Sequence, residues 1–228
     1  MKNQIKTIAF DADDTLWENE PYFREAELEF AQLFPHLPQH QVIKDLFDIE
    51  MKNLKMYGYG IKGVILCMLE AAAKLSDDKV ASSLINQILD IGHRMLQKPI
   101  VLLDGIEETL QHLHGKYRLV MATKGDLLDQ ERKLEKSGLA KYFHHIEIMS
   151  DKQPRHYEKL IKHLDCKPEN FLMVGNSRRS DIVPVLAINA FAVEVPYHIT
   201  WLHEIHDEPI EHPNFVSVTS IDQIIPLL

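Results

Sequence analysis

Cysteine is scarce in this chain of 228 residues: Cys67 and Cys166 are the only two, and they lie far apart, in no spacing typical of a metal site. We therefore predict two reduced thiols in a reducing compartment. Long apolar runs are also missing. None approaches the length that spans a membrane, and the N-terminal residues lack the apolar segment of a signal peptide. These absences predict a soluble, cytoplasmic protein with no membrane partner.

Positive charge is in deficit, with 25 Lys and Arg against 34 Asp and Glu and a net charge of -9. Nucleic acids and anionic membranes bind basic patches, so neither is expected as the main partner. A small phosphorylated metabolite remains compatible, because a few local cations and a metal ion suffice to hold it. The sequence has no internal repeat or low-complexity segment, and it leaves the oligomeric state open.

One long segment in the first half of the chain has a different residue pattern from the rest. Residues 17–99 carry apolar side chains at helical spacing and contain no strand candidate. Helices are predicted there over residues 21–34, 41–56, 61–75 and 79–97. We interpret this block as an all-helical insertion.

From residue 100 onward, strand and helix patterns alternate. Strands are predicted over residues 117–122, 145–149, 170–174 and 190–195, and helices over residues 105–114, 126–137, 155–164 and 181–187. Such alternation is typical of a mostly parallel sheet covered by helices. The sequence therefore predicts an α/β, Rossmann-like core made of residues 1–16 and 100–228, with residues 17–99 as a separate helical domain.

The first strand carries the strongest functional signal. Residues 5–10 are apolar and rich in β-branched side chains, and three carboxylates follow within four positions: Asp11, Asp13 and Asp14. Open α/β sheets bind ligands at the carboxyl ends of their strands. Like charges so close repel one another, and a divalent cation such as Mg²⁺, which takes oxygen ligands, relieves the repulsion. This segment predicts a metal-assisted site for an anionic substrate.

Polar residues also follow the other predicted strands. Thr123 follows the second strand and Lys152 the third, while Asn176 and Asp181 follow the fourth. Because parallel strands end at the same edge of a sheet, we expect these side chains to converge near Asp11.

In this order, the residues resemble the four motifs of the haloacid dehalogenase-like hydrolase superfamily. The motifs are Asp11-Ala12-Asp13-Asp14-Thr15, Thr123, Lys152 and Gly175-Asn176-Ser177-Arg178-Arg179-Ser180-Asp181. They span residues 11–181, and the helical insertion is similar to the cap domain that this family places after the first motif. The resemblance implies a phosphatase-type member with a helical cap over residues 17–99.

The resemblance also implies catalytic roles. Asp11 is the expected nucleophile, which forms an aspartyl-phosphate, and Asp13 is the expected general acid and base. Thr123 is expected to donate a hydrogen bond to the phosphoryl oxygens. Lys152 is expected to offset the negative charge of nucleophile and phosphate.

Mg²⁺ is the cofactor that the resemblance implies. Its expected ligands are the carboxylate of Asp11, the carbonyl of Asp13, and Asp181, directly or through water. Asn176 departs from the family pattern, because many members carry Asp there. Asn keeps an oxygen ligand but lacks the charge, so either the metal affinity is lower or Asp181 carries the metal without it.

The expected activity is Mg²⁺-dependent hydrolysis of a small phosphomonoester. A dehalogenase or a phosphomutase of the same superfamily, or a non-enzymatic phosphate-sensing module, are the alternatives. Asp13 argues against a dehalogenase, which has no use for a second carboxylate there, and a large insertion that excludes water favours turnover over sensing. Tyr57-Gly58-Tyr59-Gly60 with Lys62 is the segment where we expect substrate selectivity, unless it is only a turn between two helices.

Overall fold

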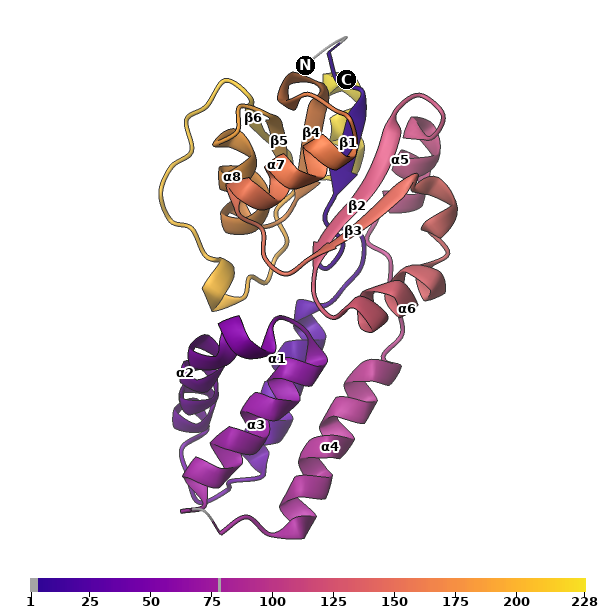
Figure 1. Cartoon of the computed structure of the whole chain (residues 1–228). Helices are drawn as coiled ribbons and strands as arrows, with labels where there is room; N and C mark the ends of the chain where they lie inside the picture. The colour runs from indigo at the N-terminus through magenta and orange to yellow at the C-terminus, as the bar shows by residue number, and fades with distance from the viewer. Residues whose placement is uncertain (1–3, 78) are drawn as a thin grey trace. The chain divides into compact units, whose positions relative to one another are not determined.

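The computed structural model describes residues 4–77 and 79–228, which divide into two compact units (Figure 1). The sheet unit contains Met1–Glu20, Ile100–Lys124 and Gln130–Leu228, and the helical unit contains Pro21–Pro99 and Gly125–Asp129. Most of the helical unit is therefore one insertion into the sequence of the sheet unit.

A parallel sheet of six strands forms the centre of the sheet unit, in the order β3-β2-β1-β4-β5-β6. The strands are β1 (Thr7–Phe10), β2 (Arg118–Lys124), β3 (His145–Met149), β4 (Phe171–Gly175), β5 (Phe191–Glu194) and β6 (Phe215–Ser217). The predicted α/β, Rossmann-like fold is thus confirmed. The sequence pattern missed β6, because three partly exposed residues give no clear strand signal.

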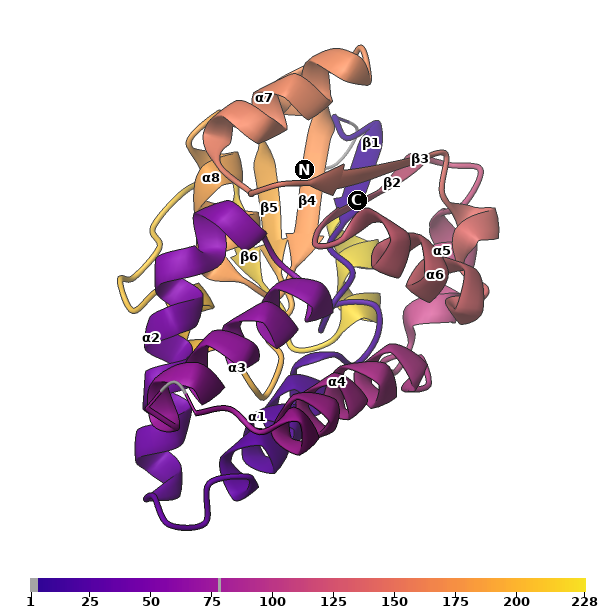
Figure 2. The same ribbon diagram turned by 60° about the horizontal axis from the view of Figure 1, so that its bottom comes forward.

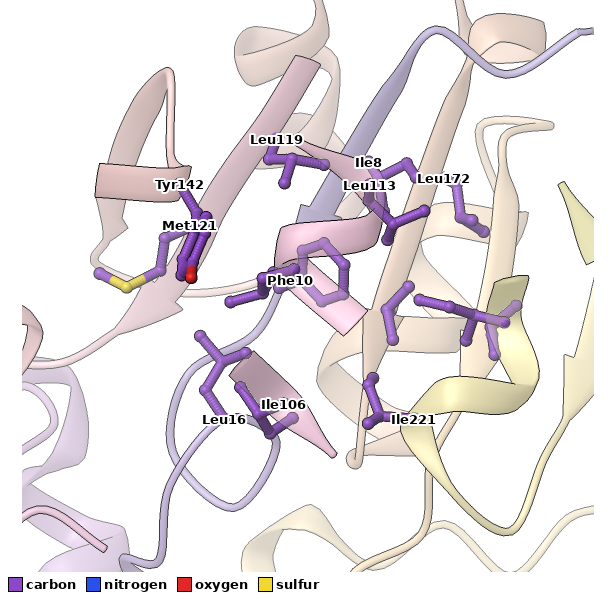
Figure 3. Close-up of a cluster of buried hydrophobic side chains, with 14 of the residues drawn as sticks. Ile8, Phe10, Leu16, Ile106, Leu113, Leu119, Met121, Tyr142, Leu172 and Ile221 are labelled. Carbon is purple, nitrogen blue, oxygen red and sulfur yellow. The ribbon is translucent and has the colours of Figure 1, made fainter. Parts of the chain in front are cut away.

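Helices cover both faces of the sheet, which explains why β1 and β4 are buried along their whole length. The helices of this part of the chain are α5 (Ile106–Leu113), α6 (Leu127–Ser137), α7 (Pro154–His163) and α8 (Val183–Leu186), with short helical turns η1 (Ala140–Tyr142), η2 (Pro168–Asn170), η3 (Arg178–Ile182), η4 (Leu202–Glu204) and η5 (Ile221–Leu227). Successive side chains of β1 point to opposite faces. Ile8 and Phe10 pack with Leu113 of α5 in one cluster (Figure 3), whereas Ala9 packs with Tyr157 of α7 in the other.

The two segments that connect the sheet unit to the insertion pair with each other. The Glu18 N–H donates to the carbonyl of Val101 (2.9 Å), and the Leu103 N–H donates to the carbonyl of Leu16 (3.0 Å). This short antiparallel ladder fixes both connections at the start and end of the insertion.

Among the described residues, four helices make up most of the helical unit (Figure 2): α1 (Glu20–Gln32), α2 (Gln39–Tyr57), α3 (Ile61–Leu75) and α4 (Ser82–Gln97). Their shared core includes Phe30, Leu46, Met68 and Ile88, one from each helix. No helix within the described residues is long and apolar enough to cross a membrane.

The turn between α2 and α3 uses two glycines in the left-handed region, Gly58 (φ 73°) and Gly60 (φ 106°). A Cβ atom on Gly60 would lie 3.2 Å from the backbone nitrogen of Asp126, so this turn packs closely against the segment Gly125–Asp129. The ammonium of Lys62 forms an ion pair with Asp126 (2.9 Å).

Candidate active site

The register of the sheet brings the predicted motifs to one edge. Phe10, the last residue of β1, pairs with Met121 of β2 and with Val174 of β4. The Asp11 N–H continues this ladder by donating to the carbonyl of Val174 (2.9 Å). Because the strands are parallel, the segments that follow them all leave the sheet at this edge.

A buried lysine joins two carboxylates at the centre of the edge. Lys152 Nζ lies 2.5 Å from Asp11 Oδ1 and 2.6 Å from Asp181 Oδ1, and the lysine side chain is 1% exposed. When both carboxylates are ionised, the trio of Asp11, Lys152 and Asp181 carries an excess negative charge. Burial and the neighbouring Asp181 together raise the pKa of Asp11 to about 7. Burial acts to lower the pKa of Lys152, but the two carboxylates more than offset it and raise that pKa.

The turn after β4 places Asp181 next to Lys152. The sequence predicted an α-helix from residue 181, but the wider π-helical turn η3 comes first and contains Asp181. Ser177 caps the turn, since its side chain accepts the Ser180 N–H (3.0 Å), and the Ser177 N–H donates to Asp181 Oδ2 (3.0 Å). A Cβ atom on Gly175 would lie only 2.3 Å from Asp181 Oδ2, so the close packing of this carboxylate requires glycine.

Asn176 is linked to the first motif through Thr15. The Thr15 hydroxyl lies 3.1 Å from Asn176 Oδ1 and 3.4 Å from Asp11 Oδ2, and it accepts the Asn176 N–H (3.1 Å). Oxygen atoms of Asp11 and Asn176 therefore face the same hydroxyl. Thr15 belongs to the recognised motif, but its role as this link could not be read from the sequence.

Asp13 is bound by donors that the sequence analysis did not single out. Its Oδ1 accepts from Trp17 Nε1 (2.8 Å) and from Lys133 Nζ (2.9 Å), and its Oδ2 accepts from Gln130 Nε2 (2.8 Å). Gln130 and Lys133 lie on α6, 117 and 120 residues further along the chain, so only the folded structure reveals them. The carboxylate of Asp13 consequently points toward α6.

Asp14 has different hydrogen-bond partners from Asp11 and Asp13. Its Oδ1 accepts the backbone N–H groups of Asn19 (2.8 Å) and Glu20 (3.0 Å), where α1 begins. Asp14 itself adopts a left-handed conformation (φ 61°). Burial raises the pKa of Asp14 to about 7. The three carboxylates thus have separate sets of hydrogen-bond donors.

Thr123 lies near the end of β2, which runs one residue further, to Lys124. The side chain is buried, and within the described residues its hydroxyl donates to the Lys124 carbonyl (3.2 Å) rather than to a carboxylate of the site. Thr123 therefore sits at the predicted edge without being joined to Asp11.

The oxygen donors at this edge fit a hard cation only in part. Carboxylate and amide oxygens of Asp11 and Asn176 are suitable, and the excess negative charge around Lys152 favours a cation. Asp181 is fully buried, and its two oxygens accept from Lys152 and from the Ser177 N–H. In the described part of the chain, no three His, Cys, Asp or Glu side chains are grouped to hold a metal.

The comparisons with known proteins agree with this fold. The family model described as haloacid dehalogenase-like hydrolase matches residues 5–184. The chain is therefore a member of the haloacid dehalogenase-like hydrolases.

One solved relative resembles nearly the whole chain. The haloacid dehalogenase-like family hydrolase of Xanthomonas campestris is 38% identical, with a TM-score of 0.84 over 95% of this chain and 87% of that chain. The 2-haloacid dehalogenase of Pseudomonas syringae pv. tomato DC3000 is 17% identical, with a TM-score of 0.67 over 98% of this chain and 97% of that chain. The second likeness shows the shared fold alone.

A curated relative carries a named activity. Glyceraldehyde 3-phosphate phosphatase of Methanothermobacter thermautotrophicus is 32% identical over 126 residues, which are 52% of this chain and 54% of the relative. The match thus spans about half the length of that protein.

Proposed function

We propose that this chain is a Mg²⁺-dependent phosphatase that hydrolyses a small phosphomonoester through an aspartyl-phosphate on Asp11. The observation that carries the proposal is the buried Lys152, bound to Asp11 and Asp181 at the carboxyl edge of the sheet. The curated phosphatase relative supports it. In this proposal the sheet unit is the catalytic core and the helical unit is its cap.

Asp11 performs the first step. Lys152 binds Oδ1 of Asp11 (2.5 Å), which leaves Oδ2 for attack on phosphorus. The new Oδ2–P bond forms as the P–O bond to the leaving group breaks, and the bonding electrons go to the leaving oxygen. The ammonium of Lys152 offsets the negative charge that nucleophile and phosphoryl group bring together.

Asp13 moves the protons in both steps. It gives a proton to the leaving oxygen, then takes one from the water that attacks phosphorus and releases inorganic phosphate and free Asp11. Trp17, Gln130 and Lys133 hold its carboxylate and so limit the orientations that it samples. Thr123 would turn its hydroxyl from the Lys124 carbonyl to the phosphoryl oxygens.

Mg²⁺ would be held by the Asp11 carboxylate, the Asp13 carbonyl and the Asn176 amide oxygen. When bound, it supplies charge neutralisation on the phosphoryl oxygens. Asp181 would contribute to the metal site directly or through water, and its Oδ1 also holds Lys152 in place. Asn176 adds no charge, so we expect a metal affinity below that of a site with Asp at this position.

Phosphate release from a panel of sugar, triose, nucleotide and small organic phosphates, with Mg²⁺ or with EDTA, tests the proposal. We expect Mg²⁺-dependent release from at least one member, and its loss in Asp11→Asn. Isomerised product without phosphate release would identify a phosphomutase instead. Metal-independent halide release from a haloacid would identify a dehalogenase.

A further inference from the structure

A second ion pair lies beside the site and belongs to none of the four motifs. Lys124 ends β2 and Glu204 ends η4, and Lys124 Nζ lies 2.5 Å from Glu204 Oε1. Each side chain is only 13% exposed. Glu204 Oε2 accepts hydrogen bonds from the hydroxyls of Ser177 and Ser180, and Lys124 Nζ also donates to Ser180 Oγ (2.8 Å).

Every partner of Glu204 in this cluster adjoins a residue of the proposed site. Lys124 directly follows Thr123 at the end of β2. Ser177 directly follows Asn176, and Ser180 directly precedes Asp181. To hold only its own segment in place, a carboxylate would need no more than one hydrogen-bond donor, located anywhere on the surface. Glu204 instead connects the ends of β2 and β4.

The cluster is also joined to Asp181 by a hydrogen bond. The Ser177 N–H donates to Asp181 Oδ2 (3.0 Å), so a shift of Ser177 would shift the carboxylate that binds Lys152. Without Glu204, the largely buried ammonium of Lys124 and the two hydroxyls would lose their shared acceptor. Such groups reorganise when they lose a buried partner.

We propose that Glu204 is a positioning residue that fixes the turn carrying Asn176 and Asp181, acting through Lys124, Ser177 and Ser180. This inference rests on the proposed function, and it adds a residue from outside the recognised motifs. Burial alone would raise the pKa of Glu204, but Lys124 and the two hydroxyls more than offset it and lower the pKa to about 2. Glu204 therefore remains a charged acceptor at neutral pH.

The test compares Glu204→Gln with Glu208→Gln, which neutralises an exposed carboxylate of the same segment. Isothermal titration with MgCl₂ should show about 10- to 100-fold weaker binding in Glu204→Gln, the usual effect of losing a group that orients metal ligands. Amide hydrogens of residues 176–181 should exchange faster. Glu208→Gln should match the wild type in both measurements.

Further variants separate positioning from folding. Lys124→Met should weaken Mg²⁺ binding as well, and the double variant Lys124→Met/Glu204→Gln should be less affected than the sum of the two single changes. Glu204→Asp should restore part of the affinity. If Glu204→Gln does not fold, Ser180→Ala removes one hydroxyl of the cluster and should still speed amide exchange.

Unchanged Mg²⁺ affinity and unchanged exchange in folded Glu204→Gln would overturn the inference. Neither Mg²⁺ binding nor amide exchange depends on turnover. The proposal about Glu204 and the proposed phosphatase function can therefore be refuted independently of each other. A wild type that binds Mg²⁺ but hydrolyses no phosphomonoester would overturn the proposed function, while weaker Mg²⁺ binding by Glu204→Gln would still support the role of Glu204.

Discussion

Lys133 Nζ lies 2.9 Å from Asp13 Oδ1, although the two residues are 120 positions apart in the chain. Lys133 also donates to the side chain of Asn19 (2.7 Å), so the lysine connects α6 to the segment that follows the first motif. In the proposed mechanism, this ion pair orients the residue that transfers both protons.

Replacing Lys133 by Met should therefore lower kcat about 10- to 100-fold, because a misplaced catalytic group loses much of its effect. KM should change less, since Lys133 is not proposed to touch substrate. Lys136→Met, an exposed change on the same helix, is the matched control and should retain wild-type kinetics. Equal kcat values for Lys133→Met and Lys136→Met would show that the ion pair is not needed to orient Asp13.

Replacing Lys152 by Met should destabilise the fold by about 3–5 kcal/mol, because it leaves two buried carboxylates without their cation. Urea unfolding at pH 7 measures the change. The control is Lys44→Met, which removes an exposed ion pair with Asp48 and should leave the free energy of unfolding close to that of the wild type. Similar losses of unfolding free energy in the two variants would contradict the claim that Lys152 stabilises two buried carboxylates.

The stability that Glu204 contributes should depend on pH in a defined direction. Its folded pKa of about 2 lies below the ordinary value of 4.5, so the ionised form stabilises the fold above pH 4.5 and this stabilisation disappears as pH falls toward 2. This pKa shift corresponds to a contribution of about 3 kcal/mol to the free energy of unfolding at neutral pH.

Urea unfolding of wild type and Glu204→Gln at pH 7, 4 and 3 measures this linkage. The difference in the free energy of unfolding should narrow at each step toward low pH. A difference that stays constant or widens would show that the ionised carboxylate is not what stabilises the cluster.

The parallel sheet and the edge where its motifs meet could be predicted from the sequence because local patterns encode them. The apolar segment before Asp11 indicates a strand, and the alternating strand and helix patterns after residue 100 indicate further elements. Each of these patterns can be recognised within a window of about ten residues. Parallel pairing then requires that the strand ends share an edge.

The partners of the site residues could not be predicted, because they come from distant segments. Glu204 lies near three histidines in a segment that resembles a solvated loop, yet its side chain points into the site edge. Gln130 and Lys133 look like ordinary surface residues of an amphipathic helix until α6 packs beside Asp13. Asp14 resembles a third metal ligand, and only the backbone of Asn19 and Glu20 shows that it fixes the start of α1.

The central claim is that Asp11 carries the phosphoryl group during turnover. The most direct test is to acid-quench the enzyme during turnover of a phosphomonoester with Mg²⁺, and to locate covalent phosphate by peptide mass spectrometry. We predict phosphate on the Asp11 peptide of the wild type, and none in Asp11→Asn, which should also lose phosphate release. Sustained phosphate release by Asp11→Asn, or phosphate found on a different residue, would contradict the account.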